Sequence, residues 1–256
     1  PRNIIEGTGN MSFTSRDTAR AAAIYNEMLG DKDCSIFLTL AGSTSAGGCM
    51  NLYTDLVKHN MVDAIVATGA SIIDMDFFEA LGFKHYQGSQ FEDDAKLRQN
   101  YIDRIYDTYI DEEELQACDQ TICDVANSLK PKAYTSREFR ELTEIKLQSK
   151  QSGLLMIGGG VPKNFIQDTV VCAELLGKKV DMHKYAIQIT VADTRDGACS
   201  SSTLKEASSW GKVDITKEQM VFAEATSVLP LIASDAYHRE NWKKRDKRNF
   251  SNIFKS

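Results

Sequence analysis

The chain has 256 residues, enough to bury a large core in one α/β domain, although this length also accommodates two domains. Thirty basic against 36 acidic residues leave a net charge of −6, which argues against nucleic acid as a partner. The six cysteines are scattered, without a CxxC spacing, and favour reduced thiols of a cytoplasmic protein over a disulfide or zinc framework. No apolar run reaches membrane-spanning length, and the first residues lack a signal-peptide pattern.

The first part of the chain alternates between helical patterns and short apolar runs. Residues 14–30 predict a helix, because Thr14 can cap it, alanines fill it and a glycine can end it. The apolar run 34–40 predicts a buried strand, which the Gly/Ser loop 41–48 joins to a further helix. A strand, a small-residue loop and a helix N-terminus together form a frequent phosphate site. A tight turn that needs small residues explains the loop equally well.

The same pattern repeats along the chain. Further buried strands are predicted by apolar runs at 62–68, 153–157, 186–191 and 221–228. Further helices are predicted at 72–81, 85–110, 111–129, 163–177, 204–210 and from 231 into a basic end at 243–248. Such repetition predicts an α/β fold with a mostly parallel sheet and helices on both faces, whose ligands bind at the carboxyl ends of the strands.

The stretch 196–213, DGACSSSTLKEASSWGKV, concentrates residues that can carry chemistry. Thr203 and Glu206 have the spacing of a capping box, so a short helix starts here. Glu206 and Trp210 then share one helix face, with Lys212 just beyond the helix end. A carboxylate, an indole face and an amine predict a pocket for a cationic alkylamine, beside which the lysine can become a nucleophile.

The same three side chains also have a purely structural interpretation. Glu206 is then a solvated helix residue, Trp210 a core residue and Lys212 an ordinary surface cation. Spacing alone does not decide between the two interpretations.

Four stretches of the chain, in order, resemble the deoxyhypusine synthase family. They are LVKHNMVDAIVATGA (56–70), LLMIGGGVPKNFI (154–166), SSWGKV (208–213) with Glu206 ahead of it, and VFAEATSVLPLI (221–232). The resemblance covers most of the chain and implies the Rossmann-like, NAD-binding fold of that family in a single domain, 1–256. It also implies NAD-dependent aminobutyl transfer from spermidine or a related polyamine, with Lys212 as the catalytic residue that carries the aminobutyl group as an imine.

The resemblance assigns further residues to two ligands. Those implied to bind NAD are Ser43, Thr44, Ser45, Thr68, Gly69, Ala70, Asp74, Gly159, Asp196, Ser200, Glu224 and Ala225. Those implied to bind the polyamine substrate are Glu206, Trp210, Asn164, Asp168 and Cys199. The carboxylate of Asp74 is expected at the ribose hydroxyls; its alternative role is to cap a helix.

Two positions depart from the family pattern. Where this chain has Asn164, the family usually has a histidine that shuttles protons, and an amide cannot titrate near neutral pH. Where it has Cys199, the family has an aspartate that holds an ammonium end of spermidine, a contact worth roughly 1.5–3 kcal/mol. We therefore expect dehydrogenation and capture by lysine to survive, with a changed choice of amine.

A family segment of several tens of residues is expected to be missing between Phe139 and Arg140. In the family it contains a strand and an Asp-containing loop that contacts NAD and amine. Either the protein lacks this segment or the sequence omits a disordered stretch.

Three functions remain open at this point. The first is aminobutyl transfer to a lysine of the hypusine-bearing translation initiation factor. The second is a homospermidine-synthase-like transfer to a small polyamine, and the third is a non-catalytic NAD-binding relative that serves as a scaffold. The resemblance also implies a homotetramer built from tight dimers, with each active site between two subunits.

Overall fold

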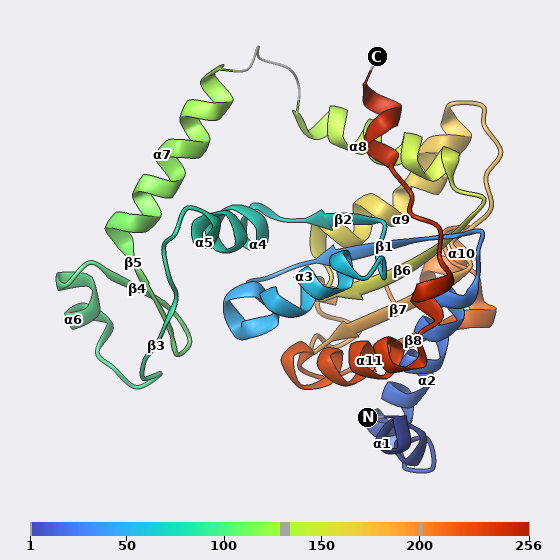
Figure 1. Cartoon of the computed structure of the whole chain (residues 1–256), viewed down its shortest axis with the longest axis horizontal. Coiled ribbons are helices and arrows are strands. Elements are labelled where there is room, and N and C mark those ends of the chain that lie inside the picture. The colour runs from blue at the N-terminus through green and yellow to red at the C-terminus, as the bar shows by residue number, and fades with distance from the viewer. Residues whose placement is uncertain (1, 129–133, 200–201, 256) are drawn as a thin grey trace.

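Within residues 2–128, 134–199 and 202–255, which this computed structural model describes, a five-stranded parallel sheet has the order β2-β1-β6-β7-β8. A smaller antiparallel sheet has the order β3-β5-β4 (Figure 1). The strands are β1 (Cys34–Leu40), β2 (Ala64–Ala67), β3 (Tyr86–Gln87), β4 (Ile102–Ile105), β5 (Thr108–Asp111), β6 (Gln151–Ile157), β7 (Tyr185–Thr190) and β8 (Glu218–Phe222).

Helices fill most of the connections between these strands. They are α1 (Arg2–Thr8), α2 (Phe13–Gly30), α3 (Met50–Lys58), α4 (Gly69–Ser71), α5 (Phe78–Ala80), α6 (Asp94–Gln99), α7 (Glu112–Ser128), α8 (Tyr134–Gln148), α9 (Gly160–Leu175), α10 (Leu204–Ser209) and α11 (Ala225–Arg239). Short π-type turns lie at Ser45–Cys49 and Ile72–Phe77, and 3-10 turns at Gly197–Cys199, Ile215–Lys217, Asn241–Lys244 and Phe250–Phe254. None of the helices in the described ranges is both long and apolar enough to cross a bilayer.

Both faces of the large sheet are covered by helices, as the repeated strand–helix pattern predicts (Figure 1). β1 and β7 are buried along their whole length, which is typical of parallel strands packed on two sides. Alternate side chains point to opposite faces: Ile36 and Leu38 share a core with α2, α3 and α11, whereas Phe37 shares one with α8, α9 and α10. The predicted α/β class with a mostly parallel sheet is confirmed.

Two of the predicted strands are present, but one is less buried and the other shorter than expected. Residues 62–68 were expected to be buried, but β2 is the edge strand of the sheet and Ile65 is 41% exposed. The predicted strand 221–228 ends at Phe222, and α11 begins at Ala225. Glu224 is still extended, but its side chain accepts from the N–H groups of Thr226 and Ser227 and so caps α11, which starts at the next residue.

The prediction of one peripheral helix over 85–110 is wrong. The chain forms α6 and then a hairpin of β4 and β5, which pairs with β3. Tyr101 and Tyr106 adopt positive φ angles, of 55° and 57°, which no helix tolerates. We call residues 86–128, which comprise β3, α6, β4, β5 and α7, the arm; in Figure 1 it stands apart from the large sheet. Ile110 and Cys118 of the arm form a small core with Phe78 of α5.

The caps and cysteines also depart in part from expectation. Ser12, not Thr14, precedes the first long helix, and Thr14 lies inside α2. All six cysteines are free, and Cys34, Cys49, Cys118 and Cys199 are buried, whereas Cys123 is exposed.

Helix α8 runs without interruption through Phe139 and Arg140, where two unconnected helix fragments were expected. An ion pair of 2.6 Å joins Arg137 to Glu141 one turn later, across this junction. Such i, i+4 pairs favour a continuous helix.

The basic stretch 243–248 does not continue the helix α11, because α11 ends at Arg239 and Glu240 adopts a left-handed conformation; Lys243 and Lys244 close a separate 3-10 turn. Instead Arg245 is buried and its Nη2 lies 2.5 Å from Oδ2 of Asp63. Its guanidinium also donates to the carbonyls of Asn60 and Cys34. The C-terminal tail is thereby fastened to the start of β1 and β2.

Candidate functional site

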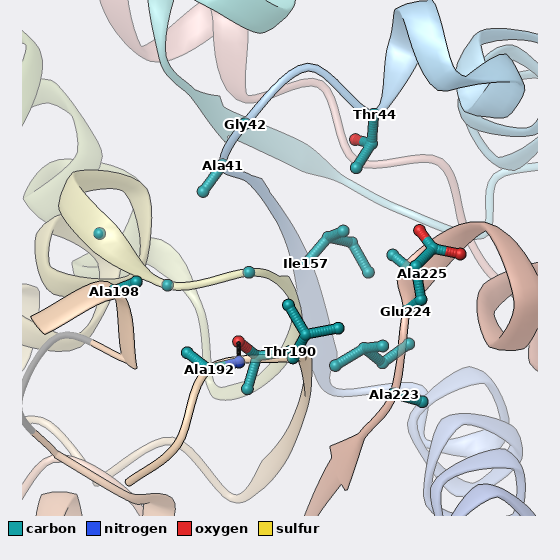
Figure 2. Close-up of a pocket in the computed structure, with 15 residues that line it drawn as sticks. Ala41, Gly42, Thr44, Ile157, Thr190, Ala192, Ala198, Ala223, Glu224 and Ala225 are labelled. Carbon is teal, nitrogen blue, oxygen red and sulfur yellow. Dashed lines mark hydrogen bonds between the residues drawn. The ribbon is translucent and has the colours of Figure 1, made fainter. Parts of the chain in front are cut away.

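The carboxyl ends of four parallel strands meet at one cavity of about 380 Å³ (Figure 2). This volume lies in the range of small-ligand sites, and this edge of a parallel sheet is where ligands bind. The lining residues come from the last residues of β6 and β7, from the segments that follow β1, β6, β7 and β8, and from the first residues of α9 and α11: Ala41, Gly42, Thr44, Ile157, Gly158, Gly159, Gly160, Ile189, Thr190, Val191, Ala192, Ala198, Ala223, Glu224 and Ala225.

The glycines after β6 bring backbone, rather than side chains, to the cavity. Gly158 and Gly160 have φ angles of 74° and 64°, a region that favours glycine. A Cβ on Gly158 would lie 3.1 Å from the Cβ of Ala41, so the two loops approach closely. Gly158 is also held by the side chain of Gln188, which donates to its carbonyl at 2.9 Å. The N-terminus of α9 therefore faces the cavity with a cap residue, Gly159, that has no side chain.

Glu224 supplies a carboxylate to the lining. Its oxygens accept hydrogen bonds from the backbone N–H of Thr226 at 2.9 Å and of Ser227 at 3.1 Å. Partial burial alone would raise its pKa, but hydrogen bonds from the hydroxyl and N–H groups of Thr226 and then of Ser227 outweigh burial and hold the pKa of Glu224 below its usual value. At neutral pH the site thus carries an anion that occupies the N-terminus of α11 and can accept hydrogen bonds from hydroxyl groups.

The residues expected to bind NAD divide between this cavity and its surroundings. Thr44, Gly159, Glu224 and Ala225 line the cavity. Ser43 and Ser45 flank Thr44, and the hydroxyl of Thr44 lies 2.7 Å from that of Tyr53.

The other members of this set lie further along the sheet edge. The carboxylate of Asp196 accepts from the N–H of Ala198, which lines the cavity. Thr68 lines a second cavity beside β2, α8 and α9, and Gly69 and Ala70 begin α4 next to it. Ser200 lies outside the described residues.

Asp74 is not among the lining residues of either cavity, and its charged neighbour is Asp119 of α7. Burial and then the charge of Asp119 raise the pKa of Asp74. Contact of Asp74 with a ribose stays a prediction.

The capping box and short helix predicted within 196–213 are both present. The Thr203 hydroxyl accepts from the N–H of Glu206 at 3.1 Å, and Oε2 of Glu206 accepts from the N–H of Thr203 at 2.5 Å. Helix α10 follows and buries Leu204 and Ala207 against the sheet. The hydrogen bonds from Thr203 hold the pKa of Glu206 below its usual value, so its exposed carboxylate is charged at neutral pH.

Lys212 is neither free nor on an open surface. Its Nζ lies 2.5 Å from Oδ1 of Asp168 and 5.5 Å from the centre of the Trp210 ring, and its side chain is 20% exposed. Its backbone carbonyl accepts from the N–H of His183 at 2.9 Å. Trp210 is 70% exposed, so the interpretation of Trp210 as a core residue is wrong. The structure thus brings the indole of Trp210 and the amine of Lys212 together, but the carboxylate in contact with that amine is Asp168. Glu206 is hydrogen-bonded to Thr203, and its place beside an amine substrate stays a prediction.

The two departures from the family pattern have different surroundings. Asn164 is exposed on α9, one turn before Asp168. Cys199 is completely buried and belongs to the core shared with Ile166 and Leu204. A direct contact of the Cys199 thiol with an amine substrate stays a prediction.

Sequence reasoning missed Lys163, a fully buried lysine next to Asn164. Its Nζ donates to the carbonyls of Cys199 at 2.9 Å and Ser202 at 2.5 Å, and burial lowers its pKa. The lysine therefore braces the loop that leads to α10. A signal was present, because a lysine with buried Ile166 and Val170 three and seven residues later must itself face the core.

No group of three or more His, Cys, Asp or Glu side chains in the described parts of the chain is arranged to hold a metal ion.

Comparison with known proteins gives a consistent family. The family model for deoxyhypusine synthase matches residues 3–140 and 133–236. "Deoxyhypusine synthase-like protein" of Coxiella burnetii (strain Dugway 5J108-111) is 59% identical over 319 aligned residues, covering 100% of this chain and 91% of that protein. The protein of the same name from Caulobacter vibrioides is 55% identical over 99% of this chain and 87% of its own length. "Probable deoxyhypusine synthase 2" of Methanosarcina acetivorans is 30% identical over 94% and 88%.

Proposed function

The chain belongs to the deoxyhypusine synthase family, and on that basis we propose that it is a transferase that uses NAD to move an aminobutyl group from spermidine or a related polyamine. The observation that supports this most is the position of Lys212. Its amine is held 2.5 Å from the Asp168 carboxylate and 5.5 Å from the centre of the exposed Trp210 indole.

The cavity at the strand ends suits a dinucleotide. Small side chains such as Ala41, Ala192 and Ala225 leave room, and the glycines after β6 allow a phosphate to approach the N-terminus of α9. Glu224 offers a carboxylate to ribose hydroxyls. When bound there, NAD would supply the hydride acceptor for oxidation of the carbon next to the secondary amine.

The chain's own residues would then handle the amine. The exposed face of Trp210 binds an alkylammonium. In Glu206, Oε2 is engaged in the capping box, and the second carboxylate oxygen holds an ammonium end. Lys212 captures the four-carbon amine as an imine on its Nζ, and an acceptor amine later displaces it.

The acceptor is one of two amines: a lysine of the hypusine-bearing translation initiation factor, or a small polyamine as in homospermidine synthesis. The second is favoured by the burial of Cys199 and the exposed amide of Asn164, which leave the amine site without two polar groups of the family pattern. A non-catalytic NAD-binding scaffold is the third outcome that a test must allow.

Product mass distinguishes these functions. The protein is incubated with NAD and isotopically labelled spermidine, with the initiation factor in one reaction and putrescine in another. Label in the factor supports the protein acceptor, and labelled homospermidine supports the small amine. Label in neither, without a transient of NADH absorbance, rejects the transferase and leaves the scaffold.

Three further parts belong to this proposal: a cytoplasmic location, a homotetramer and a single domain that lacks a family segment between Phe139 and Arg140. In support of the last, the two matched ranges meet at 133–140, and 319 aligned positions exceed the 256 residues of the chain.

A further inference from the structure

The contact between Asp168 and Lys212 differs from an ordinary surface ion pair. Asp168 lies in the middle of α9, with its neighbours Gln167 and Thr169 buried, so its backbone cannot drift. Lys212 is fixed by hydrogen bonds of its N–H to Ala207 and of its carbonyl to His183. Asp168 thus stands on a helix and Lys212 in a turn held by two backbone hydrogen bonds, which is how a site holds reacting groups in place.

Lys212 must lose a proton before it can act as a nucleophile. Asp168 contacts its Nζ directly, whereas Asn164, one turn earlier on the same helix face, has an amide that cannot take up a proton. The other charged groups in the neighbourhood are Lys163 of α9, whose amine is bound to two carbonyls, and Glu206 of α10, one of whose oxygens is engaged with Thr203.

We propose that Asp168 is a catalytic base and acid of this enzyme: it removes a proton from Lys212 and delivers it to the departing amine. This inference rests on the proposed aminobutyl transfer. The family pattern has its histidine at the position of Asn164, and the proposal assigns proton transfer to Asp168, one turn later on α9.

The step balances as follows. Asp168 takes one proton from the Lys212 ammonium, and the neutral amine adds to the carbon of the protonated imine formed from the polyamine. A proton moves from the lysine nitrogen to the polyamine nitrogen in the resulting diamine. The bond from carbon to the polyamine nitrogen breaks, which leaves a protonated imine on Lys212 and a free amine. Asp168 then returns its proton to that amine, which leaves as an ammonium.

The test replaces Asp168 by asparagine, which keeps the shape but cannot carry a proton. With NAD and labelled spermidine, NADH formation reports oxidation, and cyanoborohydride trapping on Lys212 reports capture. We expect the NADH transient to persist in Asp168→Asn while capture at pH 7 slows by about 100-fold, typical of a lost general base. Capture should recover as pH rises, and acetate should restore part of the rate in Asp168→Ala.

A merely structural ion pair predicts the opposite. Removing the carboxylate then favours the neutral lysine, so capture at pH 7 stays the same or quickens, and acetate has no effect. Either result overturns the role of Asp168 while the transferase stands. A wild-type protein that traps no adduct and forms no NADH rejects the proposed function itself, which keeps the two failures distinct. The affinity of Asp168→Asn for NAD is measured as a control. If it matches that of the wild type, slowed capture supports the role of Asp168 in proton transfer.

Discussion

At the scale of single residues, the Glu206 carboxylate has one role that the structure shows and one that belongs to the proposed function. One oxygen closes the capping box with Thr203, and the proposed function assigns the exposed remainder of the carboxylate to the ammonium end of the amine. Glutamine also serves at this position of a capping box. The cap and the charge can therefore be separated by substitution.

Glu206→Gln should leave the thermal unfolding midpoint nearly unchanged and raise the KM for the amine by roughly tenfold, because a charge-assisted contact is lost. Thr203→Ala is the matched control: it removes the cap, costs about 1 kcal/mol of stability and leaves the charge and the KM in place. Equal KM values for Glu206→Gln and wild type would show that Glu206 is a cap and nothing more.

A buried lysine makes stability depend on pH. Lys146 donates from Nζ to Oγ of Ser152 at 2.7 Å, and that hydroxyl lies 2.9 Å from Nδ1 of His183. Burial lowers the pKa of Lys146 to about 8 and holds that of His183 well below its usual value. Between pH 8 and the ordinary lysine pKa of about 10.4, the unfolded chain binds a proton that the folded chain does not, so stability rises with pH.

Across this pH window, the lowered pKa of Lys146 should raise the free energy of unfolding by on the order of 3 kcal/mol in total. Burial also raises the pKa of Cys34 to about 12, and this lowers the free energy of unfolding as pH rises. The effect of Lys146 is therefore measured as the difference between wild type and a variant without this lysine. Urea unfolding from pH 7.5 to 9.5 should show a smaller rise for Lys146→Met than for wild type. Lys150→Met, at an exposed lysine, should keep the full rise. Parallel curves for all three proteins would contradict the assignment.

Sequence could identify single residues only where their partners lie nearby in the chain. Thr203 and Glu206 are three residues apart, and their box formed as predicted. The contact of Lys212 with Asp168 spans 44 positions and two elements, so only packing reveals it. The exposure of Trp210 was equally hidden, since an aromatic at helical spacing is more often in a core.

At the scale of elements, the C-terminal tail is held by one buried ion pair. Arg245 and Asp63 have side chains that are each 1% exposed, and the Asp63 carboxylate also accepts from the N–H of Ile36 at 2.7 Å. A pair of this kind is costly to break from one side, because the remaining charge stays buried.

Arg245→Ala should lower the free energy of unfolding by about 3 kcal/mol, the lower end for a broken buried pair, since Arg248 lies 3.7 Å from the same carboxylate. Urea denaturation measures the change. Lys247→Ala, two residues away and exposed, should stay within about 0.5 kcal/mol of wild type. A loss below about 1 kcal/mol for Arg245→Ala would mean that the tail is not anchored by this pair.

Elements were predictable where one local pattern dominated. The runs of β1, β6 and β7 are long, apolar and flanked by small residues, and each was located to within a few residues. The arm was not predicted correctly. Leu97, Tyr101 and Ile105 have the spacing of one continuous helix, but Tyr101 has a positive φ, which such a helix does not allow. The edge position of β2 depends on the order of strands, which no single run encodes.

At the scale of the whole molecule, the repeated strand–helix unit was enough to predict the layered sheet and the edge at which its loops gather. The number of subunits was not accessible in this way. Large apolar side chains are open in the single chain: Val191 is 75% exposed beside the cavity, and Trp210, next to Lys212, is 70% exposed.

The proposed homotetramer would cover this edge with a second subunit. Sedimentation equilibrium at micromolar protein should give a mass near four times the chain's 28.5 kDa. A dimer as the smallest stable species would still allow a site between two subunits. A stable monomer under these conditions would remove the proposal.

The claim on which the account depends is that Lys212 carries the transferred group. Cyanoborohydride added during turnover with NAD and spermidine should reduce the imine and leave a butylamine adduct, which peptide mass spectrometry locates. The account predicts the adduct on Lys212, its loss in Lys212→Arg, which stays protonated but should still bind NAD, and its persistence in Lys205→Arg, at an exposed lysine seven residues earlier. An adduct on another lysine, or an undiminished adduct in Lys212→Arg, would contradict it.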